Sequence, residues 1–523
     1  MATVTELYCS AKFQIKSSIS LILIVTIAAL LPPVSSAAEW KFSPRVELKE
    51  TYTSNVYLAP LGNEKADYIT QLNPGAIISG TGPHFNLSAG YLMKNFVYAN
   101  TLNKNSTRHL LNAAGDAEIV DEYFYLDAKS SVSQQSISPL TPLSLDNGNV
   151  LDDRTEIRTY SLSPYLSHRF GNLLAAEIRY THDAVSSNEN ELLNSNAEHN
   201  LFRLKNGSSS SVTKWEIEYR KQHTDYINTS IDTGHEKYFL KLGYLLTSRF
   251  SLNATGGHER YDYVSMNRNP EGEFWLAGFS WRPRERTHIS ANGGKRFWGD
   301  TYSLMANHRA RRSVWSIAYN EDISDTRSQF LMPAAIDTAS FLNQLWEESI
   351  PDPLLRQQVV EAFMLENGIP ASLSNPVNFL SNRVFLQKRL QASVALLGAK
   401  STILFSIFNM LRDAQTSGTA DSALLGVSNI ALSDSSRQAG ANVTWHLKTS
   451  SVSSANAGLS YIQHSFPDSG LQTDTRSISL NLIRQFLPDL NGSLGLRHIR
   501  RESNTGSADY RENAITASMQ MVF

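Results

Sequence analysis

Apolar and polar residues alternate with a period of two along much of this chain, and this pattern limits its fold more than any other feature. In the segment VTKWEIEYRKQ (residues 212–222), Trp, Ile and Tyr fall on one face, whereas Lys, Glu and Arg fall on the other. Successive side chains of a β-strand point to opposite faces, so the segment predicts a strand with an apolar face and a charged face. Segments 237–246 and 477–486 follow the same pattern.

Such strands can bury their apolar faces in a sandwich or turn them toward lipid in a membrane barrel, and the connections favour the barrel. Short connections are expected near residues 81–83, 121–122, 171–172, 247–248, 283–284, 398–399 and 488–489. Longer ones alternate with them, near residues 55–66, 136–154, 185–195, 226–234, 262–271, 325–381, 416–435 and 503–509. Short periplasmic turns and longer outer loops are typical of outer-membrane barrels. The sequence therefore predicts an all-β fold, a large antiparallel transmembrane β-barrel of about 22 strands, within a range of roughly 18–24.

Composition supports a membrane barrel and argues against several other classes. Charged residues make up 18% of the chain, below the roughly 25% that is usual for soluble domains. Beyond the N-terminal region there is no run of about 20 apolar residues, which argues against a helical membrane protein. The formal net charge of −2 carries no nucleic-acid signal, so no nucleic-acid partner is expected. The only cysteine, Cys9, lies in the predicted signal peptide, which leaves no thiol for a disulfide or a metal site.

The N-terminus predicts a secretory signal peptide over residues 1–37. Two lysines precede the apolar run SISLILIVTIAALL, which is followed by two prolines and the small-residue stretch VSSAA. Cleavage after Ala37 or after Ala38 would satisfy the preference for small residues and leave residues 38–523 as the mature barrel. The alternative is an N-terminal membrane anchor, but an apolar core of about 14 residues is short for a spanning helix.

The last strand carries a specific local signal. The C-terminal sequence NAITASMQMVF places Ile515, Ala517, Met519, Met521 and Phe523 on one face. An aromatic residue that closes an amphipathic C-terminal strand looks like the signal read by the barrel-assembly machinery. We therefore interpret Phe523 as an assembly signal and predict location in the cell outer membrane, with outer-membrane lipid and that machinery as partners. The alternative is chance, because many chains end in an apolar residue.

One segment breaks the strand pattern and predicts a helical hairpin over residues 335–378. Asp352 and Pro353 form a favourable helix start, apolar residues then repeat at helical spacing, and Asn367 with Gly368 predicts a helix end. The strand count places this insertion in an outer loop between the fifteenth and sixteenth strands. It is either an ordered external loop without a special role or a lid that narrows the lumen, since long structured loops are often functional.

Charged residues on inward-facing positions are the candidate functional residues. The lumen-lining candidates are Lys214, Glu216, Glu218, Arg220, Glu177 and Arg179. Their mixed signs predict a hydrated interior without strong ion selectivity. The alternative interpretation is that they only solvate and cross-link the wall.

No catalytic constellation rises above background, so the protein is not expected to be an enzyme and no cofactor or metal site is predicted. His182 beside Asp183 is the strongest candidate for chemistry, although such a pair near a strand end is more often a solvated rim pair. No phosphate-binding loop or nucleophile-elbow motif is present. Strand-like sequence begins at residues 40–50, which argues against a nutrient transporter with an N-terminal plug domain.

Several stretches resemble a known family. They are KETYTSNVYLAP, DYITQLNPG, EYFYLDAKSSVSQQSISP, RTYSLSPYLSHRFG and AEIRYTHD, all within residues 40–185. These sequences resemble the outer-membrane proteins associated with the PEP-CTERM/exosortase system. The resemblance implies a setting of exopolysaccharide production and exosortase-dependent protein sorting, and it transfers no catalytic residue.

These observations leave three functional hypotheses. The first is an outer-membrane channel or export component linked to exopolysaccharide or PEP-CTERM surface-protein export, with polysaccharide or periplasmic export proteins as partners. The second is a non-conducting structural or docking component of an envelope export complex. The third is a barrel enzyme that acts on lipid or peptide through His182 and Asp183.

Overall fold

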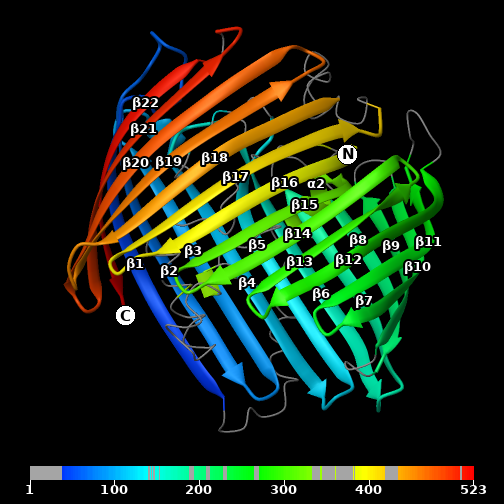
Figure 1. The fold of residues 1–523 in the computed structure, drawn as a ribbon. Helices are drawn as coiled ribbons and strands as arrows, with labels where there is room; N and C mark the ends of the chain where they lie inside the picture. Colours follow the sequence, from blue (N-terminus) through cyan, green and yellow to red (C-terminus); the bar gives the residue numbers. More distant parts are fainter. Residues whose placement is uncertain are drawn as a thin grey trace, which may run out of the picture.

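The chain forms a closed barrel of 22 antiparallel strands (Figure 1). This computed structural model describes residues 38–138, 142, 144, 148–151, 154–187, 194–207, 212–227, 232–263, 270–331, 342–343, 360, 381, 383–417, 434–506 and 509–523. The predicted all-β class and the predicted strand number are both confirmed. The predicted signal peptide over residues 1–37 lies outside the described residues.

The strands follow one another around the barrel in chain order. The first eleven are β1 (Glu39–Thr53), β2 (Asp67–Gly82), β3 (Phe85–Tyr98), β4 (Ser106–Val120), β5 (Phe124–Ser136), β6 (Arg154–Phe170), β7 (Leu174–Ser187), β8 (Ser195–Asn206), β9 (Thr213–Tyr226), β10 (Asp232–Thr247) and β11 (Phe250–Asp262). The others are β12 (Glu271–Arg284), β13 (Thr287–Arg296), β14 (Gly299–Ala310), β15 (Ser313–Asp325), β16 (Val384–Leu397), β17 (Ser401–Ala414), β18 (Ser435–Lys448), β19 (Ser453–Phe466), β20 (Leu471–Leu487), β21 (Leu490–Ser503) and β22 (Tyr510–Val522). The structure describes in full two short helices in connections, η1 (Leu102–Lys104) and α2 (Thr326–Leu331).

Connection lengths differ between the two ends of the barrel. The four longest connections, residues 54–66, 137–153, 326–383 and 415–434, all follow odd-numbered strands and therefore lie at one end. The opposite end carries tight turns, such as the one at residues 488–489, together with the C-terminus. Short turns mark the periplasmic end of an outer-membrane barrel, so the long loops lie on the outer side.

The predicted helical hairpin over residues 335–378 falls in the connection between β15 and β16 and lies mostly outside the described residues. Within it the structure describes Leu342, Asn343 and Val360, which are helical, and the side chains of Leu342 and Val360 are fully buried. Among the helices of the described ranges, none is long and apolar enough to cross a membrane.

The apolar face of each strand forms the outer surface of the barrel. On β10, for example, Tyr238, Leu240, Leu242 and Tyr244 are 53%, 44%, 48% and 51% exposed. Because the sheet closes on itself, its backbone groups pair within the sheet and leave no edge. An apolar outer surface on a closed sheet suits contact with lipid rather than with water.

The last strand has the alternation that the sequence predicts. On β22, Ile515 and Met519 are about half exposed on the outer face, whereas Glu512 and Ala514 face inward and are buried. The backbone N–H of Phe523 donates a hydrogen bond to the carbonyl of Pro44 on β1 at 2.8 Å. The role of Phe523 as an assembly signal stays a prediction.

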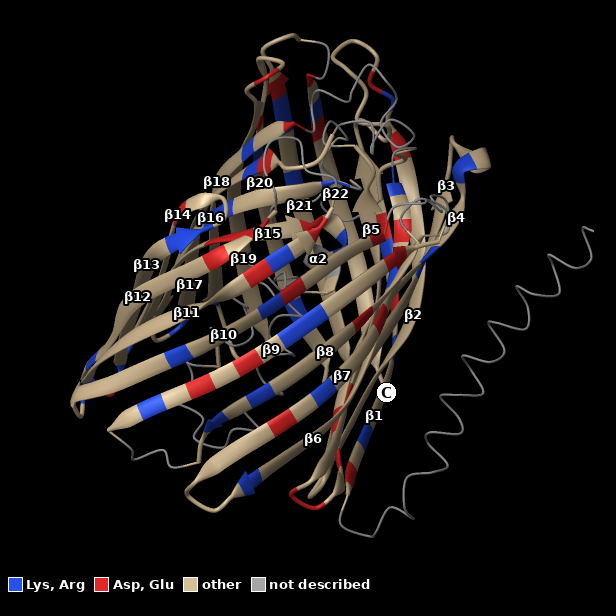
Figure 2. Cartoon of the chain, turned by 90° about the vertical axis from the view of Figure 1, so that its right-hand side faces the viewer, with Lys and Arg blue, Asp and Glu red and all other residues tan. Residues whose placement is uncertain are grey.

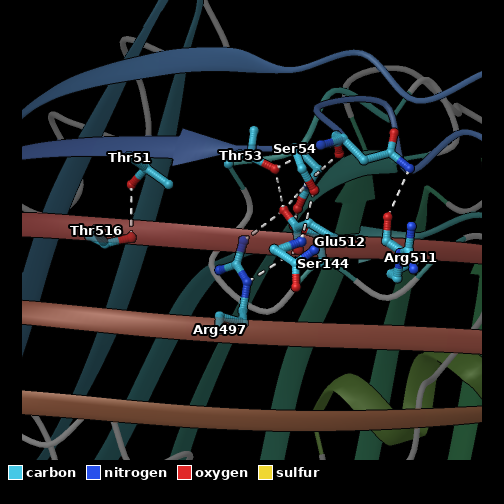
Figure 3. Close-up of polar contacts among 12 residues, drawn as sticks. Thr51, Thr53, Ser54, Ser144, Arg497, Arg511, Glu512 and Thr516 are labelled. Carbon is cyan, nitrogen blue, oxygen red and sulfur yellow. Dashed lines mark hydrogen bonds and ion pairs between the residues drawn. The ribbon is translucent and has the colours of Figure 1, made fainter.

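The barrel closes where β1 pairs with β22, and a buried polar network reinforces this seam (Figure 3). Glu512 on β22 is fully buried and accepts hydrogen bonds from Thr53 on β1 at 2.7 Å and from Asn149 at 2.9 Å. Arg497 on β21 donates to the same carboxylate at 3.0 Å. Further along the seam, the hydroxyls of Thr51 and Thr516 lie 3.1 Å apart.

The connection between β5 and β6 supplies Asn149, so a loop from another part of the barrel supports the seam. Asn149 also donates to the carbonyl of Asn55, and its amide oxygen accepts from Ser144 at 2.7 Å. Val150 packs in an apolar cluster with Val56 and Tyr98 from the first three strands and their connections. The seam is therefore covered from the lumen side by residues 148–151.

We expect the substitution Glu512→Ala to lower the free energy of unfolding by about 3–5 kcal/mol, because it removes the buried carboxylate that Arg497 and Thr53 contact. Unfolding in urea with the barrel in lipid vesicles measures this loss. The matched control is Glu502→Ala on β21, which breaks exposed ion pairs with Arg500 and Arg476 and should cost about 1 kcal/mol or less. Equal losses in the two variants would contradict a role for the network in closure.

We expect Leu242→Arg to destabilise the folded barrel by about 2–4 kcal/mol, because the charge would be placed on the lipid-facing surface. The same urea titration in vesicles measures the change. Lys241→Arg is the control, since the neighbouring side chain faces the lumen and keeps its charge. An unaltered unfolding midpoint for Leu242→Arg would show that this face does not meet lipid.

Candidate functional site

The inward-facing charges of β7 and β9 belong to one ion-pair network on the lumen wall. Arg179 contacts Glu177 at 3.0 Å and Asp127 on β5 at 2.6 Å. Glu218 lies 2.8 Å from Arg220 on the same strand. These contacts involve four of the six sequence candidates and add Asp127, which the sequence analysis missed.

Arg203 on β8 joins the two halves of this network. Its guanidinium lies 3.4 Å from Glu177, 3.4 Å from Glu216 and 2.8 Å from Glu218. Strand register explains the contact, because Glu177 is directly opposite Arg203, which is directly opposite Glu218. We call the set Asp127, Arg179, Glu177, Arg203, Glu216, Glu218 and Arg220 the charge ladder.

The ladder runs across neighbouring strands, and charged positions on β7, β8 and β9 are visible in Figure 2. Positive and negative groups alternate along it, so its field is largely cancelled within the wall. Lys214, the remaining candidate, shares the inward face of β9 and is exposed, and it forms no ion pair with the described part of the chain. Arg203 escaped the sequence analysis because its strand, SNAEHNLFRLKN, has no clear charged face.

Aromatic side chains border the ladder on its β5–β6 side. The guanidinium of Arg179 lies over the ring of Tyr165, 3.6 Å from its centroid. Tyr165 also stacks on Tyr125, with ring centroids 5.0 Å apart. These contacts hold the Arg179 head group against the wall, because a cation is attracted to the face of an aromatic ring.

A second ion-pair cluster lies on the lumen side of β11–β15. Arg296 contacts the fully buried Glu259 at 2.5 Å and Asp322 at 3.1 Å, and it lies over the ring of Trp298 at 3.9 Å. Lys237 on β10 approaches Glu259 at 3.8 Å. These four inward charges are thus paired as well, and none of these residues was a sequence candidate.

Helix α2 lies inside the barrel, against the wall formed by β6–β8. Arg327, which is buried, donates to the backbone carbonyl of Asp183 on β7 at 2.9 Å and to Ser195 on β8 at 3.0 Å, and it also pairs with the Asp183 carboxylate. Strands β9 to β14 separate β8 from β15, so a segment that leaves β15 reaches this wall only across the barrel interior. Arg327 therefore fixes the start of the long loop 326–383 to the opposite wall.

The structure separates His182 from Asp183. Asp183 faces the lumen, where His199 lies 2.5 Å away and Arg327 covers it. His182 points to the outer face, where its ring contacts Tyr160 with centroids 6.1 Å apart. Neighbouring residues of a strand face opposite ways, so these two side chains do not form a catalytic pair.

A cavity of about 330 Å³ lies on the lumen wall over β4–β7, next to the ladder. Hydroxyl and amide side chains dominate its lining, with Ser161, Thr181 and Asn112 among them, and Lys129 and Arg179 add positive charge. Leu331 from α2 forms part of its wall and packs against Ile157 and Val185. We call this cavity the groove.

The inner face of β17 differs from the groove because its side chains are covered. Leu404, Ser406, Phe408 and Met410 are 2%, 1%, 5% and 3% exposed. On β4, in contrast, the inward-facing Asn112 and Ala114 are exposed. The interior is therefore asymmetric, with its solvent-accessible polar wall on the β4–β9 side.

The chain was compared with family models, curated protein sequences and solved structures. No family model and no curated protein sequence matches the chain. Among solved structures, OccK2 (OpdF) of Pseudomonas aeruginosa is similar with 8% identity, a TM-score of 0.33 and coverage of 93% of this chain and 98% of that chain. The siderophore receptor PirA from Acinetobacter baumannii has 8% identity, a TM-score of 0.44 and coverage of 92% and 80%. FpvA of P. aeruginosa, solved bound to heterologous pyoverdines, has 11% identity, a TM-score of 0.46 and coverage of 92% and 72%.

Likeness at these identities and scores carries no argument about function. The fold itself defines the class: a closed barrel of 22 strands with an apolar outer surface and short turns at one end is an outer-membrane β-barrel. The protein is therefore located in the outer membrane, in contact with its lipid.

We expect Arg327→Met to release α2 from β7 and β8, because removal of one partner from a buried ion pair costs about 3–5 kcal/mol. Amide hydrogen exchange in residues 326–331 should then become at least about 100-fold faster. Arg158→Met on β6 is the control, since Arg158 is half exposed and pairs with Glu156 at the surface. Unchanged protection in Arg327→Met would mean that other contacts hold α2 in the lumen.

Proposed function

We propose that this barrel is an outer-membrane channel that carries polar material across a hydrated lumen narrowed by α2. The observation that carries the proposal is the charge ladder, a continuous polar wall on the inward face of β5–β9. A wall of this kind offers water and polar solutes repeated hydrogen-bonding groups, and its internal pairing avoids a strong field of either sign. A channel or transporter role fits the architecture.

The finer part of the proposal is the cargo. We infer that the channel serves exopolysaccharide export or the delivery of PEP-CTERM surface proteins, because residues 40–185 resemble barrels of the exosortase system. Polysaccharide and periplasmic export proteins are the partners that this role requires. The barrel-assembly machinery would act earlier, on the C-terminal strand that ends at Phe523.

A second candidate function is a non-conducting structural or docking component of an envelope export complex. The covered inner face of β17 favours it, because that side of the lumen offers no open polar wall. Electrical measurements separate the two functions, since a docking barrel conducts no ions. An enzymatic role has less support, because His182 and Asp183 face opposite sides of β7.

We expect the purified barrel to conduct ions in planar bilayers, with a reversal potential near zero under a KCl gradient because the ladder is internally paired. Glu218→Gln should shift the reversal potential toward anion selectivity, since it removes one negative charge from the lumen. Glu273→Gln is the matched control, because it removes the same charge from the outer face of β12.

Release of α2 gives a further readout in the same experiment. Arg327→Met should raise the single-channel conductance, because the segment that crosses the lumen loses its anchor on Asp183. Absence of any conductance in the wild-type protein would overturn the channel and favour the docking function. Equal reversal potentials for Glu218→Gln and Glu273→Gln would show that the ladder does not line the ion path.

A further inference from the structure

We propose that the groove over β4–β7 is a binding site for a saccharide chain, with Lys129 conferring a preference for sugars that carry a carboxylate. The inference rests on the proposed export function and names the place in the lumen where a polysaccharide would be held. Four independent features of the groove support it: its hydroxyl lining, its unsatisfied groups, its charge and its size.

The hydroxyl lining follows from the register of β5, β6 and β7. Thr159, Ser161 and Ser163 are alternate residues of β6, so all three point into the groove at intervals of about 7 Å. Ser131 on β5 pairs with Thr159 at 2.7 Å, and Thr181 on β7 pairs with Ser163 at 2.8 Å. Each hydroxyl is both donor and acceptor, which matches the hydroxyl groups along a sugar chain.

Two groups in the groove have no partner in the described part of the chain. Ser161 lies between the two paired hydroxyls on β6 and makes no side-chain hydrogen bond with the described residues. Lys129 is exposed on the inner face of β5 and forms no ion pair there, whereas Asp127 is engaged by Arg179. A bound saccharide would satisfy Ser161 with a hydroxyl and Lys129 with a carboxylate.

The charge of the groove favours an acidic ligand. Lys129 and Arg179 supply two cations, and Asp127 is the one carboxylate of the lining. Because Arg179 and Asp127 neutralise each other at 2.6 Å, Lys129 determines the net sign. The ammonium group of Lys129 therefore lies beside a row of hydroxyls. A uronic acid unit carries a carboxylate and several hydroxyls, which are complementary to these groups.

The size and the wall of the groove also suit a short saccharide segment. A volume of about 330 Å³ lies at the lower end of the range for small-molecule sites. Leu331 of α2 supplies an apolar surface at the side, where the C–H face of a sugar ring could pack. Because α2 is held across the lumen by Arg327, the groove is built from both the barrel wall and the inward segment.

Calorimetric titration of the detergent-solubilised full barrel tests the proposal, with maltohexaose as the neutral probe and an oligogalacturonate of the same length as the acidic probe. We expect both to bind and the acidic probe to bind about tenfold more tightly, the usual effect of one charge-assisted hydrogen bond. Lys129→Gln should remove that difference, whereas Lys214→Gln, on the inward face of β9 and outside the groove, should leave it in place.

Occlusion of the groove provides the positional test. Ala114 lines the groove with an exposed, inward-facing methyl group, so Ala114→Trp should fill it and weaken both probes at least about tenfold. Ser518→Trp is the matched control, because Ser518 also faces the lumen but pairs with Ser493 at the seam, outside the groove. Equal affinities in the two variants, or no binding of either probe to the wild type, would overturn the proposal.

The saccharide titration and the conductance measurement test the groove and the channel independently. Saccharide binding by a barrel that conducts no ions would keep the groove as a binding site and overturn the channel. Conductance without saccharide binding would keep the channel and overturn the groove. Heat-induced mobility on a denaturing gel shows whether Ala114→Trp has folded, so loss of binding in a folded barrel is assigned to the groove.

Discussion

A sheet whose outer face meets lipid must satisfy its backbone hydrogen bonds within itself, and the pairing of β1 with β22 meets that requirement here. This contact joins the first strand of the barrel to the last, so the sheet has no unpaired edge. The buried carboxylate of Glu512 binds Thr53, which lies 459 positions earlier in the sequence. Its neighbours from β21 and from the β5–β6 connection make the seam part of a larger packed region.

Closure also determines what the inner face can hold. Because successive residues face opposite ways, each apolar residue on the lipid side leaves its neighbours on the lumen side. Partly buried charges in that position require partners, since an isolated ion loses the solvation of bulk water. The charge ladder and the Glu259–Arg296 cluster satisfy this requirement on different parts of the wall. Polarity and structural stability are thus achieved by the same side chains.

Functional asymmetry arises from the strands and the loops together. The inner face of β17 carries Leu404, Phe408 and Met410, whereas that of β5–β9 carries the charge ladder. In addition, α2 leaves β15 and binds β7 and β8 through Arg327. One result is the groove, whose wall combines strand hydroxyls with Leu331. The contact of Arg327 with Asp183 therefore holds α2 in the lumen. Both the proposed channel and the proposed saccharide site depend on this position of α2.

The sequence by itself determined the class of the fold, because period-two alternation follows directly from strand geometry. The apolar face of residues 237–246 and the inward positions of Glu177, Arg179 and Glu218 could be derived from that alternation alone. Alternating long and short connections then indicated a barrel, and counting them came to the strand number that the structure has. Each of these inferences uses only residues that are close together in the chain.

Partners across strands were decided by the tertiary structure. Asp127 and Arg203 could not be assigned to the ladder, because the register that places Arg203 between Glu177 and Glu218 depends on three strands. The pairing of Asp183 with Arg327 spans 144 positions and crosses the lumen, so no local pattern contains it. A strand reveals its two faces by its own periodicity, but what each face meets is set by pairing and loop packing across the whole barrel.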